Sequence, residues 1–457
     1  MNNKNRSKIA NLKDLVKAVK NEKINMKDCI DMHQFCAFWG AYDVFSYFED
    51  IVILVHGPYG CVGNRHYLNP MGSYNLCDNK PHYTTNLSEK DVIFGGEKKL
   101  TESIYEVAEK YPDKKIAIIT NCCADIIGDD VEGCIESLPE NISSRVLFMN
   151  TGGYSGKSYR RGTEMAFKLL VSNNLNDDVC EKINEENNIK NKESKNKKVN
   201  LFLRRWLWNP IKDEEINEIS KMLNLINVDV NCVFDQNMNF EKLVKMRQSD
   251  LNVALCNFFA HGFFDEFQRK YNVPYLYSHA PIGLNSIVEW LKGIVQALGL
   301  DEDVNSLPEV QQLEIERKNL VKKIGKSRDC IIWSQTGDRL LSLLKFALEL
   351  EMNPIIVGIE PYIIKEKMNL FQREVLKGGL NSKVFASKYV EDVKELVDDL
   401  DDPIIFCNDN YFPQNKVFKY RFAHNAVYGF NGVRKMYKEM SNILDRNPSE
   451  YSLFIEE

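Results

Sequence analysis

Short runs of apolar, mostly β-branched residues alternate along the chain with longer segments in which apolar residues recur at helical spacing. Each run is followed by a turn and then by an amphipathic stretch, of which residues 338–350 are an example. Short apolar strands that alternate with helices are typical of parallel sheets built from β-α-β units. The expected strands are 115–121, 145–150, 199–203, 227–234, 251–256, 329–334, 354–358 and 403–408.

The length of the chain, 457 residues, requires more than one hydrophobic core, because a single core stops growing at about 250–300 residues. We therefore predict an α/β fold of three Rossmann-like domains, each a parallel sheet flanked by helices. Residues 181–198 are charged, rich in Asn and without apolar periodicity, and this predicts a solvated linker. The expected domains are 1–180, 199–320 with Cys256, and 321–457 with a C-terminal loop.

Composition excludes several classes of protein. Hydrophobic residues make up 44% of the chain, and the net charge of −6 gives no sign of a surface that binds nucleic acid. No run of 18 or more apolar residues is present, so we expect no membrane span. The N-terminal segment is basic but lacks the apolar stretch of a signal peptide. These features predict a cytoplasmic protein.

Twelve cysteines are present, and in a reducing cytosol cysteines serve as metal ligands, redox groups or buried small side chains rather than disulfides. Cys36, Cys61 and Cys122 lie beside glycines or at the ends of expected elements. Ligand sites form at the carboxyl ends of parallel strands, and iron–sulfur clusters need thiolate ligands. The spacing of these three cysteines matches no compact ferredoxin motif, so spacing alone leaves buried structural cysteine as the alternative.

Cys256 also ends an expected strand and precedes a segment rich in Phe. It is a candidate metal ligand or a structural cysteine. The remaining cysteines are not accompanied by other candidate ligands in the sequence and are expected to be structural. The chain contains neither a GxxxxGK[ST] sequence nor a GxGxxG sequence after a strand, so we expect no nucleotide site on this polypeptide.

Five segments in collinear order resemble the nitrogenase component 1 family, specifically its α-type subunit. They are HGPYGC at 56–61, VIFGGEKKL at 92–100, TNCCADIIGDD at 120–130, LNVALC with KYNVPYL at 251–256 and 270–276, and VYGFNG at 427–432. The resemblance runs from about residue 30 to residue 440. It implies a nitrogenase-like oxidoreductase, an electron-transfer protein that binds metal.

The resemblance also implies site residues and partners. Cys36, Cys61 and Cys122 match the α-side ligands of a cluster shared with a homologous β-type subunit, either an eight-iron P-cluster or a 4Fe-4S cluster. Cys256 matches the cysteine that holds a second metallocluster. The family further implies an α2β2 heterotetramer and a separate ATP-dependent iron–sulfur protein as electron donor.

Several positions depart from the nitrogenase pattern. Tyr428 stands where nitrogenases have the second, histidine ligand of the cofactor, and His424 is a possible substitute. Tyr159 and Thr163 stand where nitrogenases carry Gln and His beside the cofactor, and Asn69 replaces an Arg. Val44 matches the valine that shapes substrate access. Without the proton-delivering His, general-acid catalysis on dinitrogen is unsupported, and we expect a different substrate.

Two functions from different classes remain open. The first is the α-type subunit of a reductase, which passes electrons through the Cys36/Cys61/Cys122 cluster to a substrate site near Cys256. The second is a scaffold for cofactor maturation, which holds and releases an iron–sulfur precursor and would suit a weak second ligand. A third possibility is that the Cys256 site binds an organic tetrapyrrole, although the nearby phenylalanines are more typical of a helix core.

Overall fold

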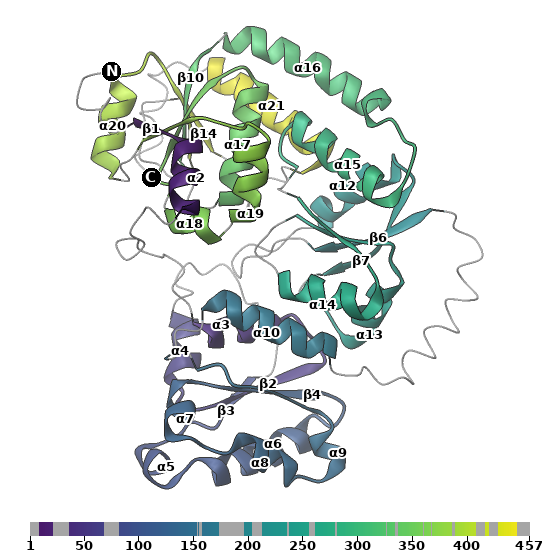
Figure 1. The fold of residues 1–457 in the computed structure, drawn as a ribbon, viewed down its shortest axis with the longest axis vertical. Coiled ribbons are helices and arrows are strands. Elements are labelled where there is room, and N and C mark those ends of the chain that lie inside the picture. Colours follow the sequence, from purple (N-terminus) through teal and green to yellow (C-terminus); the bar gives the residue numbers. More distant parts are fainter. Residues whose placement is uncertain are drawn as a thin grey trace.

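Three sheets follow one another along the long axis of the molecule (Figure 1). We describe them from a computed structural model. It describes residues 9–21, 36–67, 82–152, 154, 158–172, 196–202, 213–234, 237–255, 261–278, 281–325, 327–333, 337–359, 361–366, 368–385, 389–407, 416–419 and 428–445. Within these ranges, no helix combines the length and the apolar composition needed to span a membrane.

The first sheet has four parallel strands in the order β3-β2-β4-β5. Its strands are β2 (Ile51–His56), β3 (His82–Thr84), β4 (Lys115–Thr120) and β5 (Val146–Met149). Every residue of β2 is buried, which is typical of a central strand covered on both faces. The helices of this region are α3 (Ala37–Ser46), α4 (Gly60–Tyr67), α5 (Glu89–Phe94), α6 (Glu97–Lys110), α7 (Cys122–Ile127), α8 (Val131–Glu136), α9 (Glu140–Ser143) and α10 (Tyr159–Ser172).

The second sheet is also parallel, in the order β7-β6-β8-β9. Its strands are β6 (Lys197–Phe202), β7 (Val228–Phe234), β8 (Leu251–Ala254) and β9 (Tyr275–Tyr277). The helices are α12 (Asp213–Asn224), α13 (Phe240–Lys245), α14 (His261–Tyr271), α15 (Leu284–Leu298) and α16 (Pro308–Ile324).

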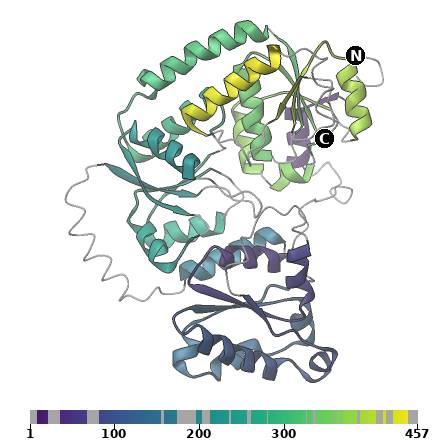
Figure 2. The same cartoon turned by 180° about the vertical axis from the view of Figure 1, so that it is seen from behind.

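The third sheet has six strands in the order β1-β12-β11-β10-β13-β14. They are β1 (Ile9–Asn11), β10 (Asp329–Trp333), β11 (Asn353–Val357), β12 (Lys383–Phe385), β13 (Ile404–Cys407) and β14 (Lys416–Lys419). The helices are α2 (Leu12–Lys20), α17 (Gly337–Glu349), α18 (Pro361–Glu366), α19 (Met368–Phe371), a π-helical turn η5 (Gln372–Lys377), α20 (Val390–Asp398) and α21 (Gly429–Asp445). Figure 2 shows α16 and α21 running side by side next to this sheet.

The α/β fold of three parallel sheets flanked by helices is the predicted one, and all eight strands expected from the apolar runs are present. The N-terminal segment differs from the expected division. Strand β1 pairs antiparallel with β12, so residues 9–11 join the third sheet and not the first. β6 begins at Lys197, inside the expected linker 181–198, whose residues 181–195 lie outside the described ranges.

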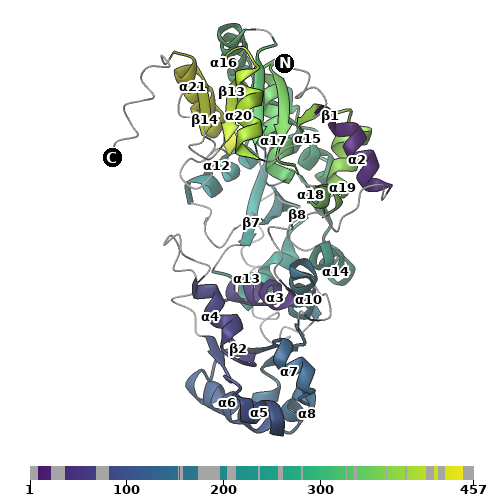
Figure 3. The same ribbon diagram turned by 90° about the vertical axis from the view of Figure 1, so that its left-hand side faces the viewer.

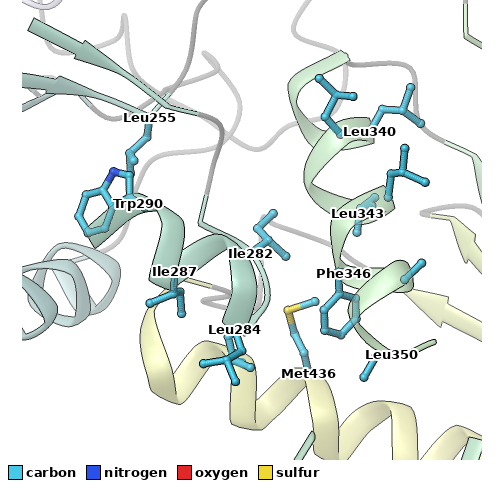
Figure 4. Close-up of a cluster of buried hydrophobic side chains, with 14 of the residues drawn as sticks. Leu255, Ile282, Leu284, Ile287, Trp290, Leu340, Leu343, Phe346, Leu350 and Met436 are labelled. Carbon is cyan, nitrogen blue, oxygen red and sulfur yellow. The ribbon is translucent and has the colours of Figure 1, made fainter. Parts of the chain in front are cut away.

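Adjacent sheets share hydrophobic cores. Phe167 of α10 contacts Phe263 of α14 with ring centroids 5.1 Å apart, within a core that joins the first and second sheets. Figure 3 shows α3 and α10 between the first sheet and α14. A larger core joins the second sheet to the third, and Figure 4 shows Trp290 beside Leu255 on one side of it and Ile282 and Met436 toward Leu343 and Phe346 of α17.

Candidate metal centre

Cys36 lies at the beginning of α3, in the N-cap position. Its backbone is extended (φ −82°, ψ 176°), and its carbonyl oxygen accepts hydrogen bonds from the amides of Trp39 and Gly40 at 3.1 and 3.3 Å. A single β-bridge joins Cys36 to Ser158, just before α10. Helix geometry at the N-cap leaves the side chain outside the helix barrel. The thiol is therefore presented at the N-terminal start of α3, next to the start of α10.

Two glycines allow α3 and α10 to approach closely around this cysteine. A Cβ atom on Gly40 would lie 2.0 Å from the carbonyl oxygen of Tyr159, and a Cβ on Gly162 would lie 1.9 Å from that of Ala37. Any larger side chain at either position would force the helices apart. The close packing of these two helices thus fixes where Cys36 lies relative to the first sheet.

Cys61 lies in the first turn of α4, after the tight turn that follows β2. Gly57 has φ +148°, and a Cβ atom there would lie 2.1 Å from the side-chain oxygen of Asn121. Only glycine fits this conformation and this contact. The amides of Val62 and Gly63 donate to the carbonyl oxygen of Tyr59 at 2.9 Å, and these bonds start the helix.

Asn121 connects the Cys61 turn to the third cysteine. Its side-chain oxygen accepts from the amides of Cys123 and Ala124 at 3.0 and 3.4 Å and so caps α7, which begins at Cys122. Its side-chain nitrogen donates to the carbonyl oxygen of Pro58 at 3.2 Å. The side chain of Asn121 therefore fixes the turn before Cys61 against the start of the helix that carries Cys122.

Cys36 and Cys122, at the starts of α3 and α7, lie close enough to Cys61 in α4 to act on the charge of its thiol. Burial raises the pKa of the Cys61 thiol, and the neighbouring thiols of Cys36, Cys122 and Cys123 raise it further. Thiolates crowded in this way repel one another unless a cation neutralises them. In the described ranges, no group of three or more His, Cys, Asp or Glu residues is placed to hold a single metal ion. A multi-iron cluster differs in that each cysteine binds a different iron, so the thiols need not converge on one point.

His56 and Asp129 form a buried pair beneath this centre, which the sequence analysis did not single out. Nε2 of His56 lies 2.9 Å from Oδ2 of Asp129, and their side chains are 0% and 3% exposed. Oδ1 of Asp129 accepts from the amide of Gly96 at 2.9 Å. Burial lowers the pKa of His56, although Asp129 opposes this shift. Both residues belong to motifs that the sequence analysis did recognise, HGPYGC and IIGDD.

An exposed apolar ridge lies beside the centre. Val92, Ile93 and Phe94 at the end of α5 are 41%, 73% and 85% exposed, and Ile126 of α7, which packs near α5, is 66% exposed. A cluster of large apolar side chains in water is typical of a surface that binds another macromolecule. Figure 1 shows α5 and α7 at the end of the molecule farthest from the third sheet.

The predicted second site is only partly described. Cys256, His424 and Asn69 lie outside the described residues, although β8 and Leu255 lead directly to Cys256. Tyr428 is described, immediately before α21, where it packs against the core of the second and third sheets. The ligand roles of Cys256, His424 and Tyr428 remain predictions.

Positions compared with the nitrogenase substrate site lie on α3 and α10. The hydroxyl of Tyr159 donates to Oδ2 of the buried Asp43 at 2.7 Å. Val44 and Thr163 are buried. Phe263 and Phe264 are also fully buried and pack in the core, as expected for phenylalanines of a helix core.

Comparison with known proteins identifies the class. Residues 36–445 match the model of the family described as nitrogenase component 1 type oxidoreductase. The chain belongs to this family, as its five motifs predicted.

Among individual relatives, the chain is 26% identical over 333 residues to the nitrogenase iron-molybdenum cofactor biosynthesis protein NifE of Methanosarcina barkeri, which covers 71% of this chain and 69% of the relative. It is 26% identical over 292 residues to the nitrogenase molybdenum-iron protein alpha chain of Clostridium pasteurianum, with 61% and 50% covered. The solved structure of nitrogenase Cp1 at pH 6.5 shares the fold, with a TM-score of 0.60, 18% identity and 91% and 93% of the two chains covered.

Proposed function

We propose that this chain is the α-type subunit of a nitrogenase-like iron–sulfur reductase that acts on a substrate other than dinitrogen. The observation that supports the proposal is that Cys36 and Cys122 both act electrostatically on the thiol of Cys61, and that all three cysteines are partly buried at the starts of α3, α4 and α7. A cluster bound there would accept and pass on single electrons. The chain's own contribution is to hold the thiols in place through the Cys36 cap, the Gly57 turn and Asn121.

The surface around the cysteines supports the proposed partners. Three cysteines from one chain leave a cluster incompletely ligated, which fits a site shared with a homologous β-type subunit in an α2β2 assembly. The exposed ridge of Val92, Ile93 and Phe94 offers an apolar surface on which an ATP-dependent iron–sulfur protein can dock. Both partners would then meet next to the same thiols.

The side chains of the substrate region support a substrate other than dinitrogen. The hydroxyl of Tyr159 donates its hydrogen to Asp43, so this side chain does not take the place of the glutamine side chain that nitrogenases have at this position. Thr163, 3% exposed, has a short hydroxyl in place of an imidazole. Neither residue supplies the general acid that nitrogenases have at these positions, so proton delivery in this protein must use other groups. We propose that the substrate is reduced near Cys256, with His424 or Tyr428 opposite.

A second candidate function is a scaffold for cofactor biosynthesis. It is favoured by one specific observation, the similarity to cofactor biosynthesis proteins of Methanosarcina barkeri and of Clostridium pasteurianum, the latter 25% identical over 334 residues. A scaffold needs the same relay cysteines but must release what it binds at the second site.

The number of electrons consumed per complex distinguishes the two functions. The anaerobically purified complex with its partner subunit is supplied with an ATP-dependent iron–sulfur donor protein and ATP, and consumed electrons are counted per complex. A reductase continues for many electrons per complex and retains its iron. A scaffold stops after a few electrons and transfers its iron and sulfide to an acceptor apoprotein. Transfer without sustained electron flow would contradict the reductase proposal.

A further inference from the structure

The base of the apolar ridge is joined to the turn that carries Cys61 by one buried carboxylate. Asp129 accepts the amide of Gly96 at 2.9 Å through Oδ1 and binds His56 at 2.9 Å through Oδ2. Gly96 directly follows the ridge and Gly95 (φ +92°), and it begins α6. A Cβ on Gly96 would lie 2.5 Å from Oδ2 of Asp129, so glycine is needed for this contact.

The hydrogen bonds around His56 determine which of its nitrogens carries the hydrogen. Thr85 Oγ1 accepts from the amide of Gly57 at 3.0 Å and lies 3.1 Å from Nδ1 of His56. Its own hydroxyl hydrogen can then be donated to Nδ1, which leaves the hydrogen of a neutral imidazole on Nε2, directed at Asp129. Burial lowers the pKa of His56, which favours this neutral form. The imidazole of His56 therefore adds no positive charge to the pair.

The backbone continues this connection to the cysteines. The carbonyl oxygen of His56 accepts from the amide of Asn121 at 3.1 Å, and Asn121 caps the helix that begins at Cys122. The charge of Asp129 also reaches the segment that carries Cys122, because it contributes, after burial, to the raised pKa of the neighbouring Cys123 thiol. Asp125 and Glu97 are the other acidic groups that act on His56.

From these contacts we propose that His56 and Asp129 are a positioning pair for the electron-relay centre. They tie the base of the docking ridge to the Cys61 turn, and they place one fixed negative charge beneath the cysteines. This inference rests on the proposed function, because it assigns the pair to a redox group held by those cysteines. A negative charge held in a buried site stabilises the oxidised, more positive form of a nearby redox group, since it is weakly screened there.

The test is a redox titration of the full complex with dithionite, followed by electron paramagnetic resonance. Asp129→Asn removes the charge and should raise the reduction equilibrium constant of the centre at least tenfold, which is about 59 mV for a one-electron couple. Asp130→Asn is the matched control, because Asp130 is the exposed neighbour and does not bond His56. It should leave the potential within the scatter of repeat titrations.

A second pair of variants separates positioning from general stability. His56→Leu removes both ring hydrogen bonds, whereas His56→Gln keeps a donor near the Nε2 position. We expect His56→Leu to increase hydrogen exchange in peptides spanning 57–63 and 95–100 together and to shift the potential, and His56→Gln to restore both largely to wild type. A change in melting temperature without either effect would indicate a structural role alone and overturn the inference.

Failure of the proposed function and failure of the positioning role give different results. A wild-type complex with no iron–sulfur signal would overturn the proposed function and this inference with it. Full iron content in Asp129→Asn with an unshifted potential would overturn the positioning role and leave the proposed function standing.

Discussion

The hydroxyl of Tyr437 lies 3.1 Å from Oε1 of Glu349, a hydrogen bond that joins α21 to the end of α17 inside the shared core of the second and third sheets. The amides of Leu284 and Asn285, at the start of α15, donate to the same carboxyl group at 3.1 and 2.9 Å. One side chain thus connects three helices. Burial raises the pKa of Glu349 to about 7, against the opposing effect of these hydrogen bonds.

This pKa predicts a pH dependence of stability. Because the folded chain keeps a proton that the unfolded chain loses above the ordinary glutamate pKa of 4.5, the contribution of Glu349 is largest below that pH and is lost as pH rises through 7. The loss is about 3 kcal/mol. Glu349→Gln should therefore gain stability relative to wild type between pH 5 and 8, measured as the melting temperature of the purified complex. The exposed Glu351→Gln should show no such trend, and parallel pH profiles for wild type and Glu349→Gln would contradict the prediction.

Replacing any one of Cys36, Cys61 and Cys122 with Ala should remove most of the iron and the paramagnetic signal of the relay centre. The reason is that each thiol contributes a separate ligand to a shared cluster. Iron and acid-labile sulfide are measured on the anaerobic complex. Cys134→Ala is the control, because Cys134 lies on α8 with its thiol directed at the carbonyl oxygen of Glu97. Full iron in the triple variant would refute the assignment.

Gly57→Ala should prevent assembly of the cysteine centre. Its φ of +148° and the 2.1 Å approach to Asn121 leave no room for a methyl group. The turn must therefore change its conformation, which costs about 2 kcal/mol or more. We expect reduced iron content at normal expression. Gly60→Ala is the control in the same loop, since a Cβ there meets nothing within 4 Å. Equal iron content in the two variants would show that the turn does not position Cys61.

Phe94→Ser should slow electron delivery from the iron–sulfur donor protein at least tenfold without lowering stability. Phe94 is 85% exposed, so its removal costs the folded chain little, whereas a docking surface would lose a central apolar contact. Stopped-flow reduction of the complex gives the rate. Ile315→Ser, at a 56% exposed position on α16 far from α5, should leave the rate unchanged. Similar rates for all three proteins would place docking elsewhere.

Cys256→Ala should abolish substrate reduction and leave the relay spectrum intact, because the two proposed sites use different ligands. A structural cysteine would instead cost about 1 kcal/mol with activity retained. Replacing Tyr428 and His424 then tests the opposite side of the second site. If neither replacement alters a second iron signal, the group is held from one side, which favours the scaffold.

The apolar pattern predicts most of the fold because strands such as β4 and β13 contain short apolar runs rich in Ile, which are typical of buried parallel strands. Short edge strands gave no such signal. β1 has the sequence IAN, and its partner β12 lies at the other end of the chain. No local pattern can reveal a pairing between segments so distant in sequence.

The cysteines of the candidate site could be predicted from the sequence, but the contacts that position them could not. Family resemblance indicated Cys36, Cys61 and Cys122, whereas the roles of Asn121, His56 and Asp129 depend on the order of the strands. β2 lies beside β4 in the sheet, and this adjacency brings His56 next to Asn121 and the loop after α7. Glu349 was missed for the same reason, since the partners of its carboxyl group come from two distant segments.

The pairing of β1 with β12 has a consequence for synthesis of the chain. The register joins Ile9 to Phe385, so β1 must wait for its partner strand until the long intervening segment, which contains the first two sheets, has been translated. The first sheet, whose strands all lie between residues 51 and 149, can form long before that. We therefore expect the cysteine-bearing region to fold first and the third sheet to close last, with α2 unprotected in the interval.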